Sequence, residues 1–142
     1  MVRKIMRKID CIFCKIADKE ISSKILFEND SILAFLDISP ISEGHSIVIP
    51  KNHYLNLEDI PDNELTEIYK IVKKIAIKIH KILKVDGYNI LQNNFTAAGQ
   101  VVKHFHVHII PRNYDDKIFQ IEIPRSQASD KNLDEVFKIL RF

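Results

Sequence analysis

Cysteine, glycine and long apolar runs are all scarce in this sequence. Its 142 residues include 2 cysteines, 3 glycines and no tryptophan. Two cysteines cannot form the disulfide scaffold of a small secreted protein, and a chain of this length buries enough core to fold without one. No stretch approaches the roughly 18 consecutive apolar residues that cross a membrane. The absence of repeats, low-complexity tracts and Pro/Gly-rich linkers predicts a single domain.

The overall composition is that of an ordinary soluble globular protein, with 46% hydrophobic and 28% charged residues. A net charge of +2 creates no field that would favour nucleic acid. The chain begins with several basic residues, but no apolar run long enough for a signal peptide follows them. We therefore expect a cytoplasmic protein without nucleic-acid or membrane partners. Residues 1–10 are expected to form a basic, solvated arm, and residues 11–142 a single domain.

Hydrophobic periodicity and turn residues predict the order of the secondary-structure elements. In chain order we expect a short helix over 11–18, strands over 25–28, 31–37 and 45–49, a long helix over 62–84, strands over 88–92 and 103–110, and a final helix over 130–141. Pro50 and Pro111 are expected to stop strands, and Asp86-Gly87 to end the long helix. The final helix is expected to bury the stripe Leu133, Val136, Phe137 and Leu140. This order predicts an α+β fold, with an antiparallel sheet of about five strands and helices on one face.

Three histidines alternate along the last predicted strand. Side chains in a strand alternate faces, so His104, His106 and His108 are expected to point the same way, about 6.5–7 Å apart. Burying several titratable rings costs free energy unless each finds a partner, so this row favours a functional site over packing. Such a row supports metal binding or nucleophilic attack on phosphorus.

The residues before this row favour the phosphorus chemistry. Asn93 and the turn Ala98-Gly99-Gln100 offer amide donors and exposed backbone N–H groups, which suit phosphoryl oxygens. A Gly-Gln pair alone is a weak signal, but it gains weight a few residues upstream of three alternating histidines.

At this point the sequence resembles the histidine-triad (HIT) family, whose motif is His-x-His-x-His followed by apolar residues. The motif occupies residues 104–112 here. Further blocks match the family in order and spacing, namely Asp37-Ile38-Ser39-Pro40, Gly44-His45, the stretch 48–53 and the loop 93–100. The resemblance covers roughly residues 11–112.

The resemblance implies a homodimer in which the sheets of two protomers join, and hydrolysis or transfer at the α-phosphorus of a purine nucleotide. His106 would attack that phosphorus and become nucleotidylated, and water would then release the nucleoside monophosphate. His108 and His45 match the histidines that surround the nucleophile and the phosphate. The implied substrates are nucleoside phosphoramidates, adenylated amines, acyl-adenylates or dinucleoside polyphosphates.

The resemblance also assigns binding residues. Asn93 and Gln100 match amides that hold the phosphate or leaving group, and Asp37 matches the carboxylate that accepts from the ribose hydroxyls. The apolar walls around the base match Ile12, Phe13, Ile16, Ile21, Phe35 and Ile38, for which plain core packing is the alternative. Val101 follows Gly99-Gln100 where the family often has serine, so a hydroxyl near the leaving group is lost while the backbone N–H remains. Ala98 stands where a second glycine is frequent.

The pair Cys11-x-x-Cys14 has several possible roles. No thioredoxin-like βαβ pattern surrounds it, which weakens a redox role. Some members of the resembled family bind structural zinc with this pair and two histidines, which match His53 and His104. A Cys₂His₂ set is a closed structural arrangement, and it would leave catalysis to the other histidines. Two reduced buried thiols and a disulfide are the alternatives.

Two other classes of function remain open. One is a nucleotide-binding adaptor with little catalysis, which Val101 favours. The other is a metalloenzyme that binds one zinc through His104, His106 and His108.

Overall fold

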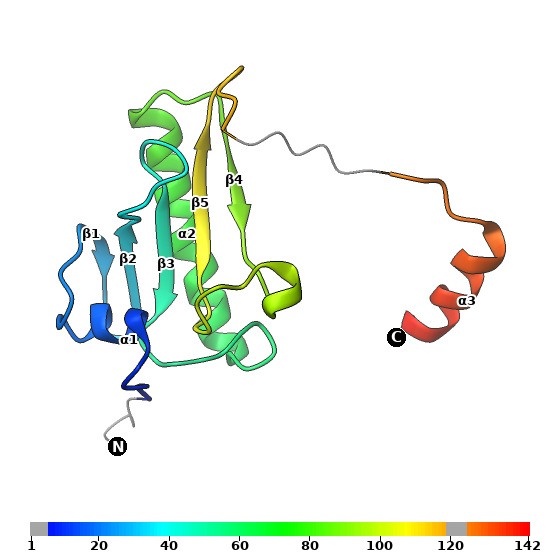
Figure 1. Cartoon of the computed structure of the whole chain (residues 1–142), viewed down its shortest axis with the longest axis horizontal. Helices are drawn as coiled ribbons and strands as arrows, with labels where there is room; N and C mark the ends of the chain where they lie inside the picture. The colour runs from blue at the N-terminus through cyan, green and yellow to red at the C-terminus, as the bar shows by residue number, and fades with distance from the viewer. Residues whose placement is uncertain (1–5, 119–124) are drawn as a thin grey trace.

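The computed structural model describes residues 6–118 and 125–142. The elements are α1 (Ile12–Ala17), β1 (Ile25–Glu28), β2 (Ile32–Leu36), β3 (Ser46–Pro50), α2 (Asp62–Ile82), β4 (Gly87–Leu91), the 3₁₀ turn η1 (Thr96–Ala98), β5 (Val107–Arg112) and α3 (Asp130–Leu140). The strands form one antiparallel sheet in the order β1-β2-β3-β5-β4, as Figure 1 shows. The predicted α+β fold with a five-stranded antiparallel sheet is confirmed. No described helix has the length and apolar character needed to cross a membrane.

The central strands β2 and β3 are buried on both faces, because α1 and α2 pack on opposite sides of the sheet (Figure 1). Alternate residues of β2 divide between the two layers: Ile32 and Ala34 belong to the α2 core, whereas Leu33 and Phe35 belong to the α1 core. The expectation of helices on one face is therefore wrong for α1. Cys14 and its neighbours give this short helix an apolar side, and that side covers the second face.

Helix α2 ends earlier than its sequence predicts. Its last hydrogen-bonded turn closes when Leu83 N–H donates to the Ile79 carbonyl, and Lys84 then adopts a left-handed conformation with φ 54°. A glycine or asparagine usually occupies such a position. Gly87, which was expected to end the helix, instead begins β4. The expected stop at Asp86-Gly87 is therefore wrong.

Pro50 ends its strand as expected, but Pro111 does not. Pro50 is the last residue of β3, and β5 continues through Pro111 to Arg112. The register of β3 with β5 includes residues only up to Ile109, so Pro111 lies where β5 pairs with β4 alone. A strand tolerates proline where one side of its ladder needs no donor.

Helix α3 forms over the predicted residues but does not bury the predicted stripe. The four residues of this stripe are between 43% and 68% exposed. Figure 1 shows α3 apart from the sheet, on the far side of β4. The expectation that this helix completes the core of its own chain is wrong, since neither core cluster contains a residue of α3.

Candidate active site

A cavity of about 480 Å³ opens between α1, the end of β2 and the start of β5. It is large enough to hold a small-molecule ligand. Eleven predicted site residues line it: Ile12, Phe13, Ile16, Ile21, Phe35, Asp37, Ile38, Gly99, Val101, His106 and His108. The structure thus brings together the apolar walls, one carboxylate and two of the three alternating histidines.

A backbone carbonyl fixes the tautomer of the His106 ring. Its Nδ1 lies 2.7 Å from the carbonyl oxygen of His104, and only an N–H at Nδ1 can donate to that acceptor. A neutral ring then carries its free electron pair on Nε2. Burial lowers the pKa of His106, so the ring is neutral near pH 7. Phe13 packs edge-on against it, with ring centroids 5.0 Å apart. A fixed, neutral imidazole beside a cavity is suited to nucleophilic attack.

His45 and His108 form a directed pair beside this ring. The backbone N–H of Ile41 donates to His45 Nδ1 at 3.1 Å, so a neutral His45 carries its proton on Nε2. That Nε2–H donates to His108 Nδ1 at 2.8 Å, which leaves the proton of a neutral His108 on its own Nε2. Burial lowers the pKa of both rings, that of His108 to about 4. The chain of hydrogen bonds therefore fixes an N–H donor at the cavity.

Asp37 lies close to this pair. One of its oxygens is 3.7 Å from His45 Nδ1, and the other accepts from the backbone N–H of Ser39 at 2.8 Å. The carboxylate favours a positive charge on His45 when a proton arrives there. Asp37, His45 and His108 also lie close enough to share a metal ion, but the histidine pair is already joined by its hydrogen bond.

The three histidines keep a common face without a regular strand. β5 begins only at Val107, so the predicted strand over 103–110 is wrong at its start. Phe105 nevertheless belongs to the α2 core, whereas His104 and His106 contact Phe13 of α1 on the other face. The alternation that the sequence suggested survives in the irregular backbone before the strand.

The loop amides do not reach the cavity. Gln100 is buried, with its Oε1 accepting from Phe95 N–H at 2.9 Å and its Nε2 donating to the Leu55 carbonyl at 2.6 Å. Asn93 donates from Nδ2 to the Gly99 carbonyl at 3.3 Å. Both side chains therefore hold the loop in place, and neither lines the cavity that His106 lines.

Sequence reasoning missed part of the lining. The additional residues are Ser22, Ser23, Leu36, Ser39, Ile47 and Val102. Ser39 could have been found, because Asp-x-Ser is typical of a turn in which the carboxylate accepts from the backbone N–H two residues on. No signal in the sequence marks the other five.

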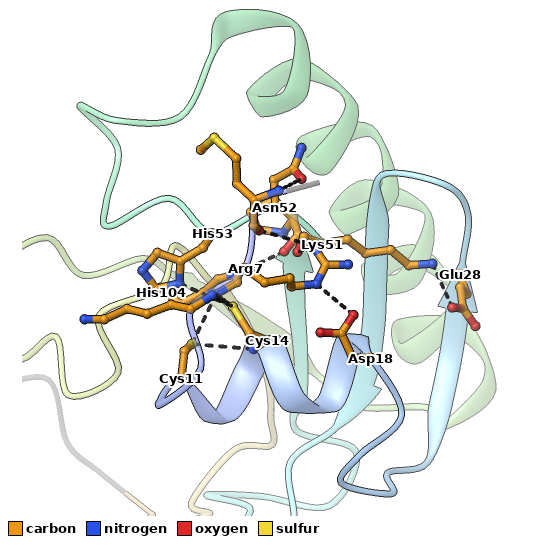
Figure 2. Close-up of polar contacts among 12 residues, drawn as sticks. Arg7, Cys11, Cys14, Asp18, Glu28, Lys51, Asn52, His53 and His104 are labelled. Atoms are coloured by element: carbon orange, nitrogen blue, oxygen red, sulfur yellow. Dashed lines mark hydrogen bonds and ion pairs between the residues drawn. The ribbon is translucent and has the colours of Figure 1, made fainter. Parts of the chain in front are cut away.

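Figure 2 shows a second cluster of potential ligands, which come from α1 and its start, the segment after β3 and the segment before β5. Cys11, Cys14, His53 and His104 place their ligand atoms within 4.8 Å of one another. The Sγ atoms of Cys11 and Cys14 lie 3.4 and 3.6 Å from His104 Nδ1, and Cys14 Sγ lies 3.4 Å from His53 Nδ1. In a tetrahedral zinc site with bonds of about 2.0–2.3 Å, ligand atoms lie about 3.3–3.8 Å apart. The four residues fit a zinc ion.

The protonation of His104 agrees with this fit. Its Nε2 donates to the Pro50 carbonyl at 2.8 Å, which leaves the electron pair of Nδ1 facing the thiols. Metal-bound histidines commonly donate their other N–H to a backbone carbonyl in this way. Burial raises the pKa of the Cys14 thiol to about 11, and a cation would reverse this by favouring the thiolate. The two cysteines are free thiols, not a disulfide.

The segment before α1 packs around the cluster. The backbone N–H of Lys8 donates to Cys14 Sγ at 3.4 Å. Arg7 forms an ion pair with Asp18 at 2.9 Å and donates to the Lys51 carbonyl (Figure 2). Arg7 is therefore not simply solvated. Residues 1–5 of the expected basic arm lie outside the described residues.

The three alternating histidines do not converge on one ion. Within residues 6–118 and 125–142, His106 joins no group of three or more potential ligands, and His104 belongs to the cysteine cluster. This arrangement argues against a metalloenzyme that uses all three rings on one zinc.

The sequence is similar to a known domain family and to several known proteins. The model of the HIT domain matches residues 18–115. An uncharacterised HIT-like protein of Methanocaldococcus jannaschii is 45% identical over 92% of this chain and 98% of its own length. Adenosine 5'-monophosphoramidase of Saccharomyces cerevisiae is 42% identical over 92% of this chain and 80% of its own. Adenylylsulfatase of Arabidopsis thaliana is 40% identical over 93% of this chain and 68% of its own.

Solved structures share the fold. A protein from Streptococcus mutans superposes with a TM-score of 0.89 at 36% identity, over 95% of this chain and 85% of its own. A zinc-bound histidine triad family protein from Mycobacterium smegmatis gives a TM-score of 0.74 at 30% identity, over 90% of this chain and 98% of its own.

Proposed function

This chain belongs to the HIT domain family, and we propose that it is a nucleotidyl hydrolase or transferase that forms a covalent intermediate on His106. The reaction would take place at the α-phosphorus of a purine nucleotide. One observation carries the proposal: Nδ1 of His106 is fixed as a donor to the His104 carbonyl, so Nε2 keeps its electron pair at the cavity. Relatives named as a phosphoramidase and an adenylylsulfatase support a hydrolase.

The cavity suggests how the substrate lies. The base would rest among apolar side chains such as Phe13, Ile16 and Phe35, and Asp37 would accept from the ribose hydroxyls. The phosphate would then lie between His106 and His108. The side chains of Asn93 and Gln100 hold the loop, and the backbone N–H groups of Gly99 and Gln100 donate to the Thr96 and Phe95 carbonyls. The phosphoryl oxygens would therefore meet the backbone N–H of Val101 instead of side-chain amides.

Two displacements at phosphorus complete the reaction. Nε2 of His106 forms a bond to phosphorus while the bond to the leaving group breaks. With the anionic substrate bound, the His45–His108 pair would carry one extra proton on His45 Nδ1 beside Asp37. The leaving group takes the proton of His108 Nε2, the proton of His45 Nε2 moves to His108 Nδ1, and both rings are left neutral. The positive charge on the nucleotidylated ring strengthens its Nδ1–H bond to the His104 carbonyl. Water then gives a proton to His108, attacks phosphorus and releases the nucleoside monophosphate and neutral His106.

We also propose that Cys11, Cys14, His53 and His104 hold a structural zinc ion. The ion would supply a closed tetrahedral crosslink between the start of α1 and the segment before β5. Because His104 would be both a ligand and the carbonyl acceptor for His106, the metal would fix the backbone that orients the nucleophile. No step of the reaction passes through the ion.

The remaining expectations stay proposals. They are a homodimer that joins the sheets of two protomers and a cytoplasmic location, without nucleic-acid or membrane partners. A nucleotide-binding adaptor with little catalysis is the second function, and it is favoured by Val101, whose side chain is 88% exposed at the cavity and offers no hydroxyl.

One assay separates these functions. The protein would be incubated with adenosine 5'-phosphoramidate, Ap₃A and Ap₄A, and AMP release would be followed. A hydrolase turns over at least one of them many times per chain, and acid-sensitive radioactivity from an α-labelled substrate is recovered on His106. Binding of AMP without turnover of any substrate would favour the adaptor.

A further inference from the structure

The hydroxyl of Ser23 is a buried polar group for which the fold provides no partner. Its Oγ exposes less than 1 Å² and forms no hydrogen bond within the described part of the chain. Buried hydroxyls are nearly always hydrogen-bonded, so an exception needs an explanation. Ser23 also lines the cavity that His106 lines. A bound ligand can therefore supply the partner that the protein does not.

Strand pairing sets Ser23 beside Asp37. Just before β1, the Lys24 carbonyl accepts from the backbone N–H of Leu36 at 3.0 Å, which extends the antiparallel pairing of β1 with β2. The next residues along the two segments are Ser23 and Asp37, and both line the cavity. Side chains of opposite residues in an antiparallel pair lie on the same face, with Cβ atoms about 4.5–5.5 Å apart. One small group of a ligand can therefore contact both.

The proposed nucleotide would place its ribose at this point, with a ribose hydroxyl donating to Asp37. A carboxylate only accepts hydrogen bonds, so the lone pairs of that ribose oxygen still need a donor. Leaving them unpaired in a closed site costs free energy. Ser22 and Ser39 are the other two serines of the lining, but both are exposed and can bond to water. Ser23 has the buried hydroxyl that can donate.

We infer that the Ser23 hydroxyl donates to a ribose oxygen of the nucleotide, so that Ser23 and Asp37 together select ribonucleotides over deoxyribonucleotides. The hydroxyl reaches the ligand by rotation of the side chain between staggered positions, and no hydrogen bond has to break first. A site built to hydrogen-bond a substrate hydroxyl discriminates against the analogue that lacks it. The inference rests on the proposed function, because it takes the ligand to be a nucleotide with its ribose at Asp37.

The affinities of three nucleotides test this contact. AMP, 2′-deoxy-AMP and 3′-deoxy-AMP would be titrated by calorimetry into the unaltered protein and into Ser23→Ala. Ser23→Ala should bind AMP about five- to tenfold more weakly, because one hydrogen bond is lost. It should bind one of the two deoxynucleotides as tightly as the unaltered protein does, because that nucleotide lacks the hydroxyl that Ser23 contacts. An equal loss for all three nucleotides, or no loss for AMP, would overturn the inference.

Ser22→Ala is the matched control, since it removes the same atom from the exposed neighbouring residue of the lining. Its affinity for AMP should stay within about twofold of that of the unaltered protein. Ser23→Ala should unfold at the same urea concentration as the unaltered protein or at a higher one, because the hydroxyl that it removes has no partner in the fold. A lower midpoint would show that this hydroxyl stabilises the free protein, and it would refute the inference.

These titrations do not depend on turnover. A chain that binds AMP but hydrolyses no nucleotide would fail as a hydrolase, and its ribose contact would still be measured. Turnover by a chain whose Ser23→Ala variant keeps its full affinity for AMP would support the hydrolase and refute the contact.

Discussion

Nε2 of His45 lies 2.8 Å from Nδ1 of His108, and the direction of this hydrogen bond is set by a backbone group outside the pair. The Ile41 N–H occupies the other nitrogen of His45, so the proton must lie between the two rings. The same logic applies to His106, whose Nδ1 faces the His104 carbonyl. Backbone geometry therefore gives one ring an electron pair and another a proton at the same cavity.

Replacing the nucleophile should separate chemistry from binding. His106→Asn removes the electron pair that attacks phosphorus, so we expect kcat to fall by a factor on the order of 10³ or more. AMP affinity should change less than about tenfold, because the apolar walls and Asp37 remain. Stopped assays measure the first quantity and calorimetry the second. An adduct trapped on any residue other than His106 would contradict the assignment.

Disrupting the histidine pair should matter most for poor leaving groups. His45→Leu leaves His108 without the donor that fixes its proton on Nε2, so kcat should fall by about 10–100-fold, within the range of general acid catalysis. The loss should shrink for substrates whose leaving group needs no proton, and His45→Gln should restore part of the rate.

Ser42→Ala is the control for this substitution, since Ser42 Oγ donates to the Pro111 carbonyl close to His45 but outside the pair. Its kcat should match that of the unaltered protein. A loss in His45→Leu that is equal for good and poor leaving groups would contradict the proton-donor role of His108.

Acid should destabilise the fold through the imidazole rings of His45 and His108. Burial lowers the pKa of His108 from 6.5 to about 4 and lowers that of His45 as well. Between these values the unfolded chain binds more protons than the folded chain, so the free energy of unfolding falls as the pH drops. At pH 7 both states are neutral. Near pH 4, His108 alone should lower the free energy of unfolding by an amount on the order of 3 kcal/mol.

Urea unfolding between pH 7.5 and 4.5 measures this slope. His108→Asn has no titrating ring at this position, so its unfolding free energy should depend less steeply on pH over the same interval. Equal slopes for the two proteins would show that His108 titrates alike in the folded and unfolded states.

The pattern of residues could predict the strands of the sheet but not its second layer, since it placed all helices on one face. Ile32 and Leu33 belong to opposite cores, as an alternating strand buried on both sides requires. His106 and His108 line the cavity together with the apolar walls assigned by family resemblance. Resemblance to relatives located Asp37, which hydrophobic periodicity alone does not mark.

The errors arise where tertiary context overrides a local rule. Pro111 continues β5 because one side of the strand has no partner at that point. The amide of Gln100 could bind a phosphate, but it is already hydrogen-bonded to the backbone of Leu55 and Phe95. Leu55 is distant in the sequence and Phe95 lies across a turn, so the sequence does not reveal these partners. The apolar stripe of α3 predicted a burial that the structure does not show, because a periodic pattern does not say whether the rest of the chain offers a surface for it.

Removing the metal should lower both the stability of the fold and the rate of turnover. We expect one zinc per chain by elemental analysis, and its loss to a chelator should cost on the order of 2–5 kcal/mol and lower Tm by roughly 10 °C. Cys14→Ser should show the same loss, with no further effect of the chelator. Turnover should fall with the metal, since His104 orients His106. A metal-free preparation with full activity and unchanged Tm would refute the zinc site.

Val101→Ser should reveal whether the missing hydroxyl limits catalysis. The side chain is 88% exposed, so the substitution should change the unfolding free energy by no more than about 0.5 kcal/mol. A hydroxyl at this edge of the cavity could donate to the leaving group, so kcat should rise by up to about tenfold for poor leaving groups and little for good ones. Val101→Ala has no hydroxyl and controls for the change in size. If neither variant nor the unaltered chain turns over any nucleotide while all bind AMP, the adaptor function is favoured over the hydrolase.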